Sequence, residues 1–274
     1  MINLKKKTPL MNLKEIYEFK YFLLQLIYRN FSLIYKQTVF GPFWQILNPL
    51  IQSGIFSLIF GKFANIPTAG IPPFLFYSSA MLAWVFFEST LLKTANSLIN
   101  SGYILRFAYF PKIIIPISIL VEGIIFLIIN LLIFLIILSF YFYNGLISNL
   151  NWGAILFLPL VALFIALLAT FIGMIISCWG ARYRDLMQIG VYGVRLLFYA
   201  SPIIYSLGSV PSKLQYLFYF NPITYFLEYF RMAFFNIDGP DISFLISAII
   251  FLLFIGIFAL KIFNKFTKNI IDYV

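Results

Sequence analysis

The chain has 274 residues, of which 62% are hydrophobic and 10% are charged, and its mean hydropathy is +0.97. No soluble fold could bury this much apolar surface, so the composition predicts an all-α integral membrane protein. The sequence has no histidine and a single cysteine, Cys178, which excludes imidazole chemistry and an intrachain disulfide.

Residues 1–36 are predicted to form a cytoplasmic N-terminal segment, and residues 37–274 a membrane domain. The lysines at 5–7 resemble the start of a signal peptide, but charged residues follow and no small-residue cleavage site does. We therefore expect no removable signal.

From Lys14 to Lys36, polar and apolar residues recur at helical spacing. This pattern predicts an amphipathic helix lying in the cytoplasmic interface, which either anchors the chain or guides a lipid-linked substrate.

Six segments are long and apolar enough to cross the hydrocarbon, which requires roughly 20 residues. The predicted spans are Phe40–Phe60, Ile71–Leu92, Ile113–Phe142, Ala154–Trp179, Ile189–Leu207 and Ser243–Ile262. Of the 19 lysines and arginines, fifteen fall on the side of both chain ends, three on the other side, and Arg195 within a span. Since cytoplasmic loops are enriched in these residues, we expect a multi-pass protein of the cytoplasmic (inner) membrane with both termini cytoplasmic. Topology thus explains the net charge of +10 without nucleic acid as a partner.

The segment between the fifth and sixth predicted spans is apolar and aromatic, but Pro211, Pro222 and Pro240 interrupt it. Neither Leu214–Phe220 nor Ile223–Phe235 is long enough to span, and the topology places both outside. We expect reentrant half-helices here, with two further spans as the alternative.

Two predicted spans carry a polar stripe on one helical face. The first stripe consists of Gln45, Asn48 and Gln52, and the other of Gln188, Tyr192, Arg195 and Tyr199. Pro49 lies within the first stripe and leaves the Gln45 carbonyl without its helical partner. The two faces could together wall a hydrated passage, or they could be helix–helix contacts.

Charged residues within the predicted spans are Glu88, Glu122 and Arg195. Because charges in hydrocarbon are costly, we expect Arg195 to pair with one of the two carboxylates.

The sequence lacks a GxxxxGK[ST] phosphate-binding loop, and it shows no metal-ligand cluster or nucleophile–base couple. We therefore expect no catalytic residues, no cofactor, no metal and no ATP hydrolysis by this chain.

Several sequence blocks resemble those of the permease subunits of ABC-2 type polysaccharide exporters, which move O-antigen, capsule and teichoic acid chains. The blocks are Tyr35–Pro49, Phe110–Pro116, Arg184–Leu186, Ala200–Tyr205, Asn221–Thr224 and Glu228–Arg231. They follow the family's order between residues 29 and 235. Any one block alone is weak evidence for the resemblance, but the complete set in this order is specific to the family.

The resemblance implies a homodimer of six-span subunits joined to two copies of a separate nucleotide-binding ATPase. Its substrate channel would be lined by Phe40, Trp44, Asn48, Gln52, Tyr192 and Tyr199. A coupling helix at Asn96–Phe107 and a second loop would contact the ATPase through Ser101, Gly102, Tyr103, Arg106, Arg182, Arg184 and Asp185. An external gate would include Asn221, Pro222, Glu228 and Arg231.

Together these features predict the transmembrane subunit of an exporter of lipid-linked polysaccharide, with O-antigen favoured on overall resemblance. Capsule, teichoic acid, a lipid or a drug are the alternative substrates within the same fold. A membrane-embedded glycan-modifying enzyme would need convergent carboxylates or a metal site, which the sequence does not show. A non-transporting scaffold would leave the polar stripes without a purpose.

Overall fold

The computed structural model describes residues 13–36, 40–41, 43–107, 109–147, 150–237 and 239–267. All regular structure within these ranges is helical, which confirms the predicted all-α class. The lysines at 5–7, Pro42 and Lys268 lie outside the described residues. The helices are α1 (Leu13–Glu18), α2 (Lys20–Tyr35), α3 (Phe43–Phe56), the π-helix η1 (Ser57–Phe63), α4 (Pro73–Ala95), α5 (Ser97–Asn100), α6 (Gly102–Phe107), α7 (Ile114–Tyr143), α8 (Trp152–Arg182), α9 (Arg184–Tyr199), the 3₁₀-helix η2 (Leu207–Ser209), α10 (Ser212–Gln215), the 3₁₀-helix η3 (Tyr216–Phe220), α11 (Pro222–Phe235) and α12 (Ile242–Phe266).

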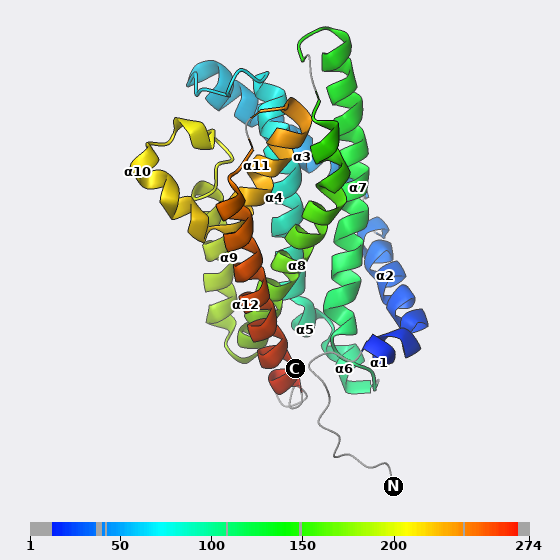
Figure 1. Ribbon diagram of the computed structural model, residues 1–274. Helices are drawn as coiled ribbons and strands as arrows, with labels where there is room; N and C mark the ends of the chain where they lie inside the picture. Colours follow the sequence, from blue (N-terminus) through cyan, green and yellow to red (C-terminus); the bar gives the residue numbers. More distant parts are fainter. Residues whose placement is uncertain are drawn as a thin grey trace.

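Five helices in the described part of the chain are long and apolar enough to cross a membrane. They are α3 with η1, α4, α7, α8 and α12, and they match five of the predicted spans to within a few residues. Figure 1 shows them as an upright bundle, with α1, α5, α6 and the end of α12 at one end.

The fifth predicted span, Ile189–Leu207, is different in the structure. α9 begins at Arg184 and ends at Tyr199, so it has 16 residues. At 1.5 Å per residue it is about 24 Å long, which is short of the roughly 30 Å of a hydrocarbon core. The helix ends early because Pro202 has no N–H and disfavours a helical backbone at Ser201.

α4 is the central helix. In the most apolar stretch of α4, 78% of the residues are buried inside the bundle. In the corresponding stretch of α3 with η1, 11% of the residues are buried. Glycines let two neighbours approach α4 closely: a Cβ on Gly123 of α7 would lie 2.5 Å from Thr90 Oγ1, and one on Gly173 of α8 would lie 2.8 Å from the Leu91 carbonyl. Residues without a side chain permit this close contact between membrane helices. The packing of the bundle around α4 therefore depends on these two positions.

α2 runs alongside α7. Ring contacts join Phe22 to Phe110, with centroids 4.7 Å apart, and Phe31 to Phe126, with centroids 5.2 Å apart. These contacts lie near opposite ends of α2, so the helix follows the first part of α7 instead of lying across its end (Figure 1). The predicted place of this helix in the cytoplasmic interface stays a prediction.

A buried ion pair fixes α11 against the turn that follows α9. Arg231 is fully buried, and its Nη1 lies 2.8 Å from Glu228 Oε1. Its guanidinium also donates to the carbonyls of Pro202, at 2.6 Å, and Ile203, at 3.0 Å. The guanidinium carbon lies 3.8 Å from the centre of the Phe76 ring of α4. Arg231, a predicted gate residue, therefore holds three segments together.

Replacing Glu228 with Gln would leave the charge of Arg231 buried without a counter-charge. Removing one partner of a buried ion pair costs about 3–5 kcal/mol. We expect the Glu228→Gln variant to unfold at a clearly lower temperature than the wild type in the same detergent. As the control, Lys213→Gln removes an exposed charge from α10 and should leave the midpoint temperature of unfolding unchanged. An unchanged midpoint for Glu228→Gln would contradict the structural role of the pair.

Candidate functional site

The polar stripes of α3 and α9 lie on helices that meet over one face of α4. The ring of Phe56 on α3 lies 5.8 Å from that of Phe198 on α9, and Phe198 lies 5.3 Å from Trp84 on α4. The predicted channel residues lie outside this aromatic contact. More than half exposed are Phe40, Trp44, Tyr192 and Tyr199, while Asn48 and Gln52 are partly buried. The structure thus brings the two predicted stripes onto neighbouring helices.

The proline in α3 is accommodated by a side chain from α7. The Gln45 carbonyl, which Pro49 leaves without its helical partner, accepts a hydrogen bond of 3.4 Å from Asn130 Nδ2. On the polar stripe itself, Gln52 Nε2 donates to Asn48 Oδ1 at 2.9 Å. Sequence reasoning missed Asn130, although an asparagine in the middle of an apolar span is a visible signal of a polar partner.

The charged residues within the spans pair differently from the prediction. Glu122, which is buried, accepts a hydrogen bond of 2.6 Å from Lys93 Nζ. Arg195 stands over the Tyr192 ring at 5.6 Å, and among the described residues it has no carboxylate within 4 Å. It lies near enough to Glu88 for the two charges to interact. Glu122 is thus not the partner of Arg195, because Lys93 neutralises it, and Glu88 interacts with Arg195 without forming an ion pair within 4 Å among the described residues.

The predicted coupling segment, Asn96–Phe107, contains the short helices α5 and α6 at the end of the bundle near α1 (Figure 1). Ser101 and Gly102 are buried, so they are not available to a partner protein. Tyr103, in contrast, is 78% exposed, and Arg106 is also exposed. A partner at this end could therefore contact the face of α6 that carries Tyr103 and Arg106.

The connection between α8 and α9 lies at the same end of the bundle (Figure 1). Arg182 and Asp185 are exposed there, and the Arg182 guanidinium stands 5.1 Å from the centre of the Tyr183 ring. The side chain of Arg184 lies outside the described residues. Two of the three residues predicted for this second contact are thus accessible from that end.

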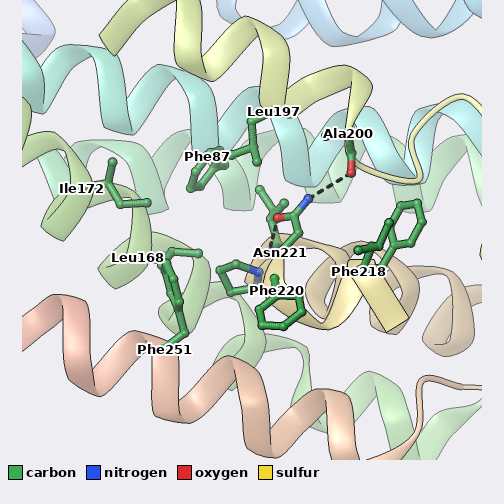
Figure 2. Close-up of a pocket in the computed structure, with 12 residues that line it drawn as sticks. Phe87, Leu168, Ile172, Leu197, Ala200, Phe218, Phe220, Asn221 and Phe251 are labelled. Atoms are coloured by element: carbon green, nitrogen blue, oxygen red, sulfur yellow. Dashed lines mark hydrogen bonds between the residues drawn. The ribbon is translucent and has the colours of Figure 1, made fainter. Parts of the chain in front are cut away.

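Asn221 and Pro222 begin α11. Asn221 Oδ1 caps the helix by accepting from the Ile223 N–H at 3.3 Å, and Pro222 occupies the first turn. Asn221 Nδ2 donates to the Ala200 carbonyl at 3.2 Å and to Ser201 Oγ at 2.9 Å. Figure 2 shows this amide at the edge of an apolar cavity of about 420 Å³ between α4, α8, α9, η3, α11 and α12. The predicted gate residues therefore join α11 to the end of α9.

Comparison with known proteins finds similarity over most of the chain. A family model described as "ABC-2 type transporter" matches residues 21–235. Two proteins of Klebsiella pneumoniae, each named O-antigen export system permease protein RfbA, are 29% identical over 262 residues and 28% identical over 240 residues. These alignments cover 93% and 86% of this chain and 96% and 88% of the relatives. A Myxococcus xanthus protein of the same name is 23% identical over 230 residues, covering 83% of this chain and 85% of the relative.

Proposed function

We propose, because the chain belongs to the ABC-2 type transporter family, that it is the transmembrane subunit of an exporter of O-antigen, a lipid-linked polysaccharide. Members of this family are membrane subunits of transporters and are not themselves catalytic. The observation that carries the proposal is the similarity, over 83–93% of this chain, to proteins named O-antigen export permeases. Those names favour O-antigen over capsule, teichoic acid, a lipid or a drug.

In this proposal two copies of the chain enclose the passage. The low burial of α3 with η1 supports a partner surface on this span. Its stripe includes Asn48 and Gln52, whose amides would lose hydrogen bonds if they faced lipid. The exposed rings of Trp44 and Tyr199 provide flat faces that can stack on the apolar faces of sugar rings. Such stacking does not depend on one linkage, so a long polymer can slide past.

Energy for transport comes, in this proposal, from two copies of a separate ATPase subunit at the end of the bundle that carries α5 and α6. The exposed Tyr103 and Arg106, and the exposed Arg182 and Asp185 beside them at that end, support this placement. The excess of lysine and arginine on the same side supports its assignment as the cytoplasmic side. Asn221 and Pro222, at the start of α11, then line the cavity of Figure 2 within the bundle beside Phe87 of α4, and α11 runs from there to the outer end, so that α11 and this cavity form the gate region.

Deleting the gene for this chain should leave the polysaccharide inside the cell and remove it from the surface. In a strain that also lacks the ATPase gene, expression of the chain together with its ATPase should restore surface polymer, whereas neither protein should do so alone. Antibody labelling of intact and permeabilised cells measures both pools. If surface polysaccharide is unaffected while export of a lipid or drug is lost, the substrate assignment is wrong and the family assignment stands.

Tyr103→Ala should weaken the association with the ATPase by about tenfold or more, because a central interface tyrosine typically contributes 2 kcal/mol or more. Copurification of the ATPase and transport by reconstituted vesicles measure the effect. Tyr109→Ala is the matched control, since Tyr109 is 95% exposed and lies outside α6. Equal losses from both variants, or none from Tyr103→Ala, would remove α6 from the interface.

Cysteines introduced at Asn48 and Tyr199 should react with a water-soluble thiol reagent, and should react faster during ATP turnover. A Cys178→Ser background suits the experiment, because the native cysteine is fully buried. A cysteine at Ile128, a half-exposed position of α7 that should meet lipid, serves as the protected control. If all three positions label at the same rate under turnover, the stripes are packing surfaces.

A further inference from the structure

A second cavity lies between α2, α7 and the segment where α4 meets α5. Its volume is about 250 Å³. Polar side chains from these elements line it: Arg29, Asn30, Lys93, Ser97, Asn100, Ser101, Ser118 and Glu122. None of the predicted channel or gate residues is among them, so this cavity is separate from the proposed passage.

The cavity offers hydrogen-bond donors that have no acceptor. Arg29 Nε and the hydroxyl of Ser97, a residue only 3% exposed, are buried and have no hydrogen-bond partner among the described residues. Within the described part of the chain, Arg29 Nη2 donates to its neighbour Asn30, at 3.2 Å. Burial lowers the pKa of the Arg29 guanidinium, because this cation has lost water. Since a buried donor without a partner costs free energy, a ligand that accepts from these groups would be stabilised here.

The balance of charge in the cavity is positive. Its one carboxylate, Glu122, is already neutralised by Lys93 at 2.6 Å. Arg29 has no carboxylate partner within 4 Å among the described residues, so its charge is uncompensated. Apolar side chains complete the wall: Leu33, Ile34, Ile115 and Ile119. A cation and a hydroxyl beside an apolar wall suit a phosphate group that carries a hydrocarbon chain.

The position of the cavity along the bundle agrees with this chemistry. α7 has 30 residues, about 45 Å, whereas the hydrocarbon core is about 30 Å thick. A centred α7 extends about 7 Å beyond each face of that core. Glu122 lies about 12 Å from the start of α7 at Ile114. The cavity is therefore near the boundary between hydrocarbon and headgroups, on the side of α5 and α6.

We propose that this cavity binds the phosphate group of a lipid in the cytoplasmic leaflet, with Arg29 and Ser97 as donors. The guanidinium can give two parallel hydrogen bonds to phosphate oxygens. The phosphate belongs either to a membrane phospholipid or to the lipid carrier of the exported polymer. Only the second source rests on the proposed function.

Dodecyl phosphate is a suitable probe, added to the purified complex of the chain and its ATPase in detergent. Native mass spectrometry measures the fraction of subunits that retain it. Arg29→Gln should lower the affinity about tenfold or more, because it removes a charge-assisted interaction. Ser97→Ala deletes a single buried hydroxyl and should lower the affinity severalfold. Lys36→Gln, which removes an exposed positive charge at the end of α2, is the matched control and should change the affinity less than twofold.

Competition with phosphatidylglycerol distinguishes the two sources. Displacement of dodecyl phosphate by phosphatidylglycerol assigns the site to phospholipid headgroups, whereas displacement by the purified lipid carrier but not by phosphatidylglycerol assigns it to the carrier. The proposal is overturned if Arg29→Gln and Ser97→Ala bind as the wild type does, or if Lys36→Gln loses as much affinity as Arg29→Gln. Inorganic phosphate that binds as tightly as dodecyl phosphate would also overturn it. None of these outcomes depends on the surface display of polysaccharide, which is the test of the proposed function. The two proposals can therefore fail separately.

Discussion

Within a membrane, an interrupted helix leaves carbonyls that water cannot satisfy, and this constraint positions several polar side chains of the protein. The proline in α3 frees the Gln45 carbonyl, which accepts from Asn130 on α7. The interruption after α9 leaves the carbonyls of Pro202 and Ile203, and both accept from Arg231 on α11. In each case the donor comes from a different helix. Each interruption therefore also joins two helices, which helps the bundle to keep its shape despite irregular segments.

Sequence reasoning located most of the fold, because an apolar run of about 20 residues is seldom anything but a membrane span. It placed the fifth span too far along the chain, since the hydrophobicity of residues 200–207 concealed the effect of Pro202 on the backbone. Trp44 and Tyr199, which the sequence predicts to line a substrate channel, are exposed in the structure, and their role in a channel stays a prediction. Glu228 and Arg231, in contrast, are buried. A motif indicates that a residue matters, but it does not distinguish a surface contact from an internal support.

The charge pairs could not be predicted because they depend on which helices are neighbours. Lys93 belongs to the end of one span and Glu122 to the interior of the next, and only the close approach of α4 and α7 brings them to 2.6 Å. Arg195 and Glu88 both lie in predicted spans, yet no ion pair joins them within the described residues. Periodicity along a helix shows which side chains share a face. It does not show what that face meets.

α4 and α7 are successive membrane helices, and the pair of Lys93 and Glu122 spans the connection between them. An acidic residue at the centre of a span costs roughly 2.5–3.5 kcal/mol during insertion, and Glu122, which lies nearer the start of α7, carries a smaller cost of the same kind. Because its partner belongs to the helix made just before, α4 and α7 can enter the bilayer as a hairpin in which the carboxylate is already neutralised. This can occur before α8 has been synthesised. Insertion of the most apolar part of the chain then does not have to await assembly of the complete bundle.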